Sequence, residues 1–220
     1  MINLKLLTDT LTMRWHVTIF ILWAIEFLNR VYINSFSNLT VGKCRYGVML
    51  REDGLVDDDG VVTRLSEHRY MITTTTTHAS AVMNRLEYLL DVDWPTLHVD
   101  LLSVTDDWAG IAVAGPRARL VLTKLTTADL SDSAVPFMGY AEIDIAGVPV
   151  RLFRISFSGE LAYEINMAPE ATPTVWDALL EAGADQEIIP YGLEAMNVLR
   201  IEKGHVVGGE LNGRTTADGL

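Results

Sequence analysis

The sequence of 220 residues has little of several features that define common classes of protein. It contains one cysteine, Cys44, which excludes both an intrachain disulfide framework and a zinc site built from several cysteines. It has 17 lysines and arginines against 29 aspartates and glutamates, which gives a formal net charge of −12. A field of that sign repels the phosphate backbone of nucleic acids. We therefore expect no nucleic-acid partner.

The sequence also has no apolar run long enough for a membrane-spanning helix, which needs about 20 residues. Residues 15–25 form a marked apolar run, but it has only eleven residues and no small-residue cleavage site follows it, as a signal peptide requires. We expect this run to form a buried or poorly packed helix. The alternative is that residues 1–26 are an atypical start, foreign to the rest of the chain. We expect no membrane partner.

Motifs for dinucleotides and metals are missing as well. The chain has neither G-x-G-x-x-G nor a Walker lysine loop, so we expect no flavin or nicotinamide site within it. The five histidines are isolated, and none has metal-ligand spacing to another. Residues 57–60 (Asp-Asp-Asp-Gly) resemble part of a calcium loop, but aligning Gly60 with the required glycine puts Leu55 and Ser66 at ligand positions that they cannot fill. We expect no metal.

The patterns that are present predict a mixed fold. We expect strands at residues 45–50, 61–62, 70–73, 99–104, 111–114, 141–145, 148–153 and 164–166. We expect helices that begin near Thr76 and near Gly115, and helices over residues 174–182 and 193–202. Strands and helices alternate irregularly, and a hairpin turns about Gly147. This order predicts an α+β fold with mainly antiparallel sheets and packed helices, and not a doubly wound parallel sheet.

Three segments are candidates for chemistry, and each has a simpler interpretation. The triple aspartate at residues 57–59 either forms a solvated turn or directs a carboxylate into a cavity. Residues 156–164 (SFSGELAYE) form either a bulged strand with a surface glutamate or part of a site. Residues 192–204 form either an amphipathic helix, on which Arg200 and Glu202 make surface pairs, or a helix that faces a ligand.

Taken together, these segments occur in an order that is more specific than any one of them. The chain carries in turn RYGVML at residues 45–50, Asp58-Asp59, IAVAGP at 111–116, FSGELAYE at 157–164 and LRIEKG at 199–204. In this combination the sequence resembles the folate-binding aminomethyltransferase family, which includes the T-protein of glycine cleavage. The resemblance begins near Phe27 and stops short of the small C-terminal β-barrel of that family.

Within the family, residues 155–165 and 200–205 are most similar to the alpha subunits of heterotetrameric sarcosine oxidases. Two departures from the T-protein motifs also favour similarity to these alpha subunits. Phe157 stands where its motif has a tyrosine, and Met196-Asn197 stand where its helix has an Arg-Asp pair.

The resemblance implies a folate-binding region over residues 27–220, in two interleaved lobes divided near residues 49 and 137. It implies a cytoplasmic module that captures the carbon of oxidised sarcosine on tetrahydrofolate, giving 5,10-methylenetetrahydrofolate. Its partners would be tetrahydrofolate and other sarcosine oxidase subunits, with flavin and NAD bound only by missing regions or by partner subunits. The alternatives are a stand-alone aminomethyltransferase of the glycine cleavage type and an inactive folate-binding fragment.

The resemblance also assigns roles to five residues. Asp59 matches the family's catalytic aspartate, and Tyr46, Glu164, Phe157 and Arg200 match folate-binding positions. A carboxylate such as that of Glu164 accepts two adjacent N–H groups of a pterin edge as a bidentate pair. For Arg200, pairing on the helix surface remains an equal alternative.

Neighbouring side chains of an extended segment point to opposite faces, so Asp58 and Asp59 cannot both face a cavity. We expect Asp59 to point inward and Asp58 to point to solvent.

Overall fold

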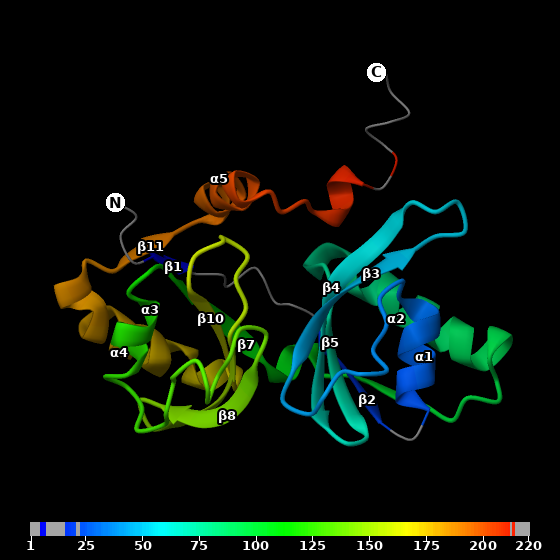
Figure 1. Ribbon diagram of the computed structural model, residues 1–220, viewed down its shortest axis with the longest axis horizontal. Helices are drawn as coiled ribbons and strands as arrows, with labels where there is room; N and C mark the ends of the chain where they lie inside the picture. The colour runs from blue at the N-terminus through cyan, green and yellow to red at the C-terminus, as the bar shows by residue number, and fades with distance from the viewer. Residues whose placement is uncertain (1–4, 8–15, 21–22, 212, 214–220) are drawn as a thin grey trace. The chain divides into compact units, whose positions relative to one another are not determined.

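The computed structural model describes residues 5–7, 16–20, 23–211 and 213, and the chain forms two compact units (Figure 1). The first unit comprises Met1–Met13 and Asp106–His205, and the second comprises Arg14–Thr105 and Val206–Leu220. Each unit therefore combines two separate stretches of the chain. Each contains one sheet whose strands are mainly antiparallel, with helices packed against it. The α+β class expected from the sequence is confirmed.

The second unit contains a five-stranded sheet in the order β3-β4-β5-β2-β6, in which every neighbouring pair is antiparallel. Its strands are β2 (His16–Phe20), β3 (Cys44–Leu50), β4 (Val56–Ser66), β5 (Arg69–Thr73) and β6 (Asp100–Ser103). Its helical segments are α1 (Ala24–Val31), the 3₁₀ turn η1 (Thr76–His78), α2 (Ala79–Tyr88), the π-helical turn η2 (Leu89–Asp93) and the 3₁₀ turn η6 (Gly208–Glu210). The buried apolar sides of α1 and α2 pack in one core with residues of β3, β4 and β5.

The prediction of a helix over residues 15–25 is wrong. His16–Phe20 form β2, whose backbone pairs with β5 on one side and β6 on the other, and helix α1 begins only at Ala24. A short apolar run has the same composition whether it becomes a buried strand or a buried helix. The β-branched residues Val17, Thr18 and Ile19 favour the strand.

The first unit contains a six-stranded sheet in the order β11-β1-β7-β10-β9-β8. Only the β1–β11 pair is parallel among the pairs of this sheet that the structure describes. Its strands are β1 (Lys5–Leu7), β7 (Ala109–Ala114), β8 (Tyr140–Ile145), β9 (Val148–Phe153), β10 (Ala162–Met167) and β11 (Ile189–Tyr191). Its helical segments are η3 (Thr105–Asp107), which begins one residue before the unit, α3 (Ala118–Leu122), η4 (Pro169–Ala171), α4 (Thr172–Gly183), η5 (Ala184–Gln186) and α5 (Leu193–Lys203).

The two faces of this sheet differ in character. Tyr163 and Ile165 of β10 point into the apolar core that includes residues of α3 and α4. Side chains alternate along a strand, so Glu164 between them lies on the opposite face. On that face Ala112 of β7 packs with Tyr191 and with Leu199 of α5. The alternation thus keeps Glu164 out of the apolar core.

Among the residues that the structure describes, no helix combines the length and the apolar character needed to cross a bilayer.

Candidate functional site

A tyrosine–aspartate pair lies on adjacent strands of the second unit. Val48 of β3 is opposite Asp59 of β4, and Tyr46 is opposite Val61, so Tyr46 and Asp59 are diagonal neighbours on one face. The Tyr46 Oη donates a hydrogen bond to Asp59 Oδ2 at 2.8 Å. The tyrosine is 43% exposed and the aspartate is half-buried. The antiparallel register therefore brings together two residues that are 13 positions apart in sequence.

The electrostatics of this pair keep the phenol protonated. Burial and the adjacent Asp59 carboxylate raise the pKa of Tyr46 well above its ordinary value. Asp59 makes no ion pair with any residue that the structure describes. A neutral donor orients the carboxylate without cancelling its charge, so the pair can supply a fixed anion to a bound molecule.

The backbone near Gly208 closes on the same carboxylate. A Cβ atom on Gly208 would lie 2.9 Å from Asp59 Oδ1, which is closer than real side chains approach. Glycine at this position therefore lets the chain after α5 pass directly over Asp59. Glycine commonly serves this purpose where backbone must approach a functional group.

The expectation that Asp58 points to solvent is wrong. Asp58 is 2% exposed, and its two carboxylate oxygens accept the backbone N–H of Thr75 at 3.2 and 3.4 Å. Its Oδ1 also lies 3.7 Å from Nδ1 of His78. Burial raises the pKa of Asp58 to about 6. Asp58 faces inward because it is opposite Met49, a residue of the apolar core.

The solvated turn that was one interpretation of residues 57–59 is also wrong, because all three aspartates lie within β4. Asp57 forms an ion pair with Arg85 of α2, and Arg85 also donates to the Leu50 carbonyl at 2.8 Å. Each of the three carboxylates thus has its own partner: a guanidinium, a backbone amide or a phenol.

Sequence reasoning missed Tyr32, which lies next to these carboxylates. Burial, together with the charges of Asp58 and Asp59, raises its pKa. Its hydroxyl is buried and has no hydrogen-bond partner within the described part of the chain. The ring packs on Gly47, where a Cβ atom would lie 2.7 Å from Tyr32 Cδ1. The only signal in the sequence was a glycine within a strand, which often marks such a close approach.

In the first unit, Glu164 lies on the non-core face of the sheet. It is opposite Ala112 of β7 on one side and opposite Phe153 of β9 on the other. Ala112 packs against Tyr191, so Tyr191 lies on this same face of the sheet. Burial and the Glu164 charge raise the pKa of Tyr191 to about 12, so this tyrosine remains a neutral hydrogen-bond donor.

Phe157 and Arg200 are both in contact with His205. The Phe157 and His205 rings have centroids 5.9 Å apart and are inclined at 49°. Arg200 Nη1 donates to the carbonyl of His205 at 3.0 Å, and its Nε donates to Asn197 Oδ1 at 3.3 Å. Arg200 is 6% exposed, so the interpretation of it as a surface pair is wrong. The first unit thus groups Phe157 and Arg200, and the second unit groups Tyr46 and Asp59.

Comparison with known proteins agrees with this fold. The family model for the GCVT N-terminal domain matches residues 23–219, and the chain belongs to this family. The resemblance that the sequence motifs indicated, to aminomethyltransferases and to sarcosine oxidase alpha subunits, is confirmed.

Two curated relatives illustrate the range of similarity. The chain is 55% identical over 192 residues to sarcosine oxidase subunit alpha of Rhizobium meliloti (strain 1021), a match that covers 86% of this chain and 20% of that protein. It is 35% identical over 194 residues to an aminomethyltransferase of Saccharopolyspora erythraea, with 88% of this chain and 51% of that protein covered. The chain therefore spans about a fifth of the first relative and about half of the second.

Solved structures share the fold at lower identity. The glycine cleavage system aminomethyltransferase T from Bartonella henselae superposes with a TM-score of 0.78 at 24% identity, covering 93% of this chain and 52% of that one. A heterotetrameric sarcosine oxidase from Corynebacterium sp. U-96 gives a TM-score of 0.60 at 17% identity, with 83% of each chain covered.

Proposed function

We propose that this chain is the folate-binding, one-carbon transfer module of a sarcosine-oxidase-like enzyme. It would take the carbon released by oxidation of sarcosine onto tetrahydrofolate, which gives 5,10-methylenetetrahydrofolate. The observation that carries the proposal is the hydrogen bond of 2.8 Å between Tyr46 and Asp59, which leaves a fixed, unneutralised carboxylate on the residue that the resemblance assigns as the catalytic aspartate. The 55% identity to a sarcosine oxidase alpha subunit supports this choice of enzyme.

The polar groups of the first unit fit a pterin-bearing substrate. Glu164 offers a half-buried carboxylate on the non-core sheet face, and a carboxylate can accept two adjacent N–H donors at once. Phe157, whose ring is partly exposed beside His205, offers an aromatic surface for the flat ring system. Arg200 is held by a backbone carbonyl and by Asn197, so we assign it to supporting the segment at His205.

Tetrahydrofolate would supply two nitrogen nucleophiles that take up a carbon at the oxidation level of formaldehyde, with loss of one water. Positive charge develops at the reacting centre during this exchange. Asp59 would stabilise that charge, because a preorganised anion in a partly dry site acts more strongly than one in water. Its carboxylate would also accept a proton that an attacking nitrogen loses. Tyr46 would keep the carboxylate in place throughout.

The oxidation of the amine would take place elsewhere in the assembly. We propose that the flavin and NAD are bound by other regions of the whole protein or by partner subunits. The module would then receive its carbon from a neighbouring active site.

The test is a complex reconstituted from this chain and the oxidising subunits, supplied with sarcosine. Methylenetetrahydrofolate and free formaldehyde are measured with and without tetrahydrofolate. We expect formaldehyde to fall by the amount of methylenetetrahydrofolate formed. Transfer from an aminomethyl-carrying protein without sarcosine would instead indicate a stand-alone aminomethyltransferase. Unchanged formaldehyde, together with no folate binding by calorimetry on the isolated chain, would indicate an inactive fragment.

A further inference from the structure

The first unit contains a pocket of about 340 Å³ that the proposed mechanism does not use. It lies between the end of β9, the turn that precedes β10 and the end of α5. Its polar lining consists of Arg154, Ser156, Glu160, Lys203 and His205. Pockets of this size accommodate small organic ligands, which are oriented by a few convergent polar groups.

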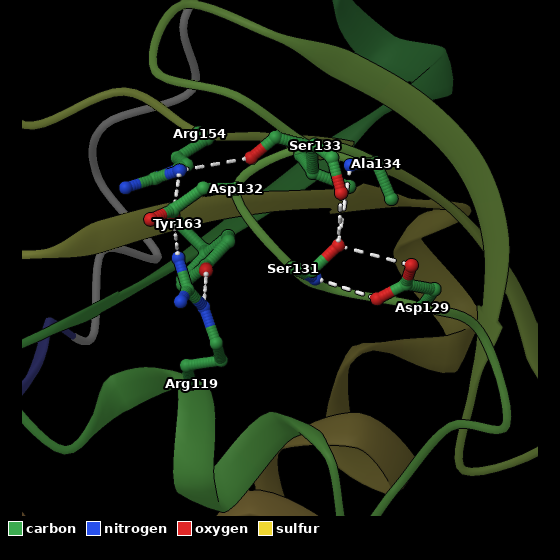
Figure 2. Close-up of polar contacts among 9 residues, drawn as sticks. Arg119, Asp129, Ser131, Asp132, Ser133, Ala134, Arg154 and Tyr163 are labelled. Atoms are coloured by element: carbon green, nitrogen blue, oxygen red, sulfur yellow. Dashed lines mark hydrogen bonds and ion pairs between the residues drawn. The ribbon is translucent and has the colours of Figure 1, made fainter.

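Arg154 is held firmly at one side of the pocket. Its Nη1 donates to Asp132 Oδ1 at 2.6 Å and to the Val135 carbonyl at 3.0 Å, and Arg119 binds the same aspartate (Figure 2). The Arg119 Nε is in turn anchored on the hydroxyl of Tyr163 at 2.9 Å. Because these contacts fix the guanidinium, it loses little freedom when it binds a ligand.

Lys203 is positioned from the other side by a glycine. Gly159 has a φ of +85°, and a Cβ atom there would lie 2.7 Å from Lys203 Cδ. The lysine stem therefore packs on the bare backbone of the turn. Helix α5 ends at Lys203, and Gly204, which follows it as the C-cap, also has a φ of +85°. The chain reverses there, so that the His205 ring meets Phe157.

Two hydrogen-bond donors at this pocket have no acceptor. The Ser156 Oγ and the Arg154 Nε are buried and make no hydrogen bond to any residue that the structure describes. Buried polar atoms are nearly always hydrogen-bonded, so unsatisfied donors in two residues that line the pocket point to an acceptor that binds beside them.

The charge of the lining narrows the choice of ligand. The lining carries Arg154, Lys203 and one carboxylate, Glu160, and Arg154 shares the carboxylate of Asp132 with Arg119. These three cations and two carboxylates leave one positive charge, in a chain whose net charge is −12. A single carboxylate balances that charge, whereas a doubly charged phosphate would exceed it and be repelled by Glu160. Arginine also matches the two oxygens of a carboxylate geometrically.

We propose that this pocket binds the carboxylate group of a small organic acid, with Arg154, Ser156 and Lys203 as its donors. Such a carboxylate has two sources: a free acid, or the acidic end of a larger ligand such as a folate. Only the second source rests on the proposed function.

The test is calorimetric titration of glutarate into the purified chain of 220 residues. We expect saturable binding that Lys203→Gln weakens by about tenfold, as for loss of one charge-assisted hydrogen bond. The glutamine keeps most of the stem that packs on Gly159, so the fold should persist, which circular dichroism checks. Lys124→Gln is the matched control, since it removes the same charge from an exposed site of the same unit, and it should change the affinity by less than about twofold.

Tetrahydrofolate and tetrahydropterin, which lacks the glutamyl tail, distinguish the two sources. If glutarate competes with tetrahydrofolate but not with tetrahydropterin, the carboxylate belongs to the folate tail. If it competes with neither, the pocket takes a free acid, and both results support the proposal even when folate binding itself fails. No saturable glutarate binding, equal losses in the Lys203 and Lys124 variants, or tighter binding of inorganic phosphate would overturn it.

Discussion

Asp59 in the second unit and Asp132 in the first are two carboxylates that are held in opposite ways. Asp59 accepts a hydrogen bond from a neutral phenol, whereas Asp132 accepts hydrogen bonds from the guanidinium groups of Arg119 and Arg154. Those two contacts lower the pKa of Asp132, even though its side chain is 73% exposed. The charge of Asp132 is thus neutralised in holding a loop to Arg119 of α3 and to Arg154, which follows β9 (Figure 2). The partner, and not the residue type or its depth, determines whether a carboxylate remains available for chemistry.

The largest effect is expected from a substitution at Asp59, the carboxylate whose charge is not neutralised. Asp59→Asn keeps the size and most of the hydrogen bonding of the side chain but removes its charge. In the reconstituted complex supplied with sarcosine, we expect methylenetetrahydrofolate formation to fall by roughly a hundredfold, as for other lost electrostatic groups. Free formaldehyde should rise by the same amount, because the amine is oxidised elsewhere.

Asp132→Asn is the matched control, because it removes an equal charge whose role is structural. With tetrahydrofolate at saturating concentration, transfer should be unchanged while the midpoint of chemical unfolding falls. The lowered pKa of Asp132 means that its stabilising contribution is present above the ordinary aspartate range and is lost as the pH falls through the lower, folded-state value. Equal losses of transfer in the two variants would contradict a special role for Asp59.

The sequence predicts part of the environment of Asp58 and Asp59, but not all of it. Strand alternation correctly put Asp58 and Asp59 on opposite faces, and the Ala146–Gly147 turn, with φ of 51° and 76°, gives the expected hairpin. Which of the two aspartates is buried depends on Met49 and Thr75, which reach β4 only through tertiary pairing. That information is absent from local periodicity.

The strand at His16–Phe20 could not be predicted for a similar reason. An apolar run of this length becomes a strand only because β5 and β6 offer backbone partners on both sides. The basic pocket was also not visible in sequence, since Arg154 and Lys203 are 49 positions apart and meet only around the Gly159 turn. Motif order identified the family, but the contacts around each carboxylate required the structure.

Glu164, a carboxylate of the first unit, can be tested for a role in binding rather than in transfer. If Glu164 accepts two N–H donors of the pterin, Glu164→Gln should weaken tetrahydrofolate binding by about 1–3 kcal/mol, the usual cost of an unmatched buried partner. Calorimetry on the purified chain measures this. Glu181→Gln, at an exposed position of α4, is the control and should bind like the parent. If both variants bind equally well, Glu164 is not the pterin-binding residue.

The role of the phenol can be tested by removing only its hydroxyl. Tyr46→Phe leaves the Asp59 charge intact but frees the carboxylate to rotate, so we expect transfer to fall by about tenfold, less than for loss of the charge itself. Tyr88→Phe, at a tyrosine that is 56% exposed in the same unit, should have no effect. A loss as large as that of Asp59→Asn would mean that Tyr46, and not the anion, is the principal catalytic group.

Asp58→Asn should have the smallest effect on transfer. It should instead change the pH dependence of stability. Burial raises the folded-state pKa of Asp58 from about 3.8 to about 6, so the folded chain binds a proton that the unfolded chain releases across this range. The free energy of unfolding should therefore fall as the pH rises from about 4 to about 6, and should stay lower above that. Asp58→Asn imitates the neutral carboxyl, and its amide oxygen can still accept the Thr75 N–H.

Relative to the parent, the Asp58→Asn variant should thus gain about 2 kcal/mol of stability between pH 4 and pH 7.5, as the difference between the folded and unfolded pKa values implies. Urea unfolding at the two pH values measures the difference, and comparison within each variant cancels the effect of the changed shape. His78, whose Nδ1 lies 3.7 Å from Asp58, opposes this trend because its positive form stabilises the charged carboxylate. A relative loss of stability at pH 7.5 would mean that the contacts with Thr75 and His78 outweigh desolvation, and that Asp58, like Asp132, is a carboxylate whose charge serves the fold.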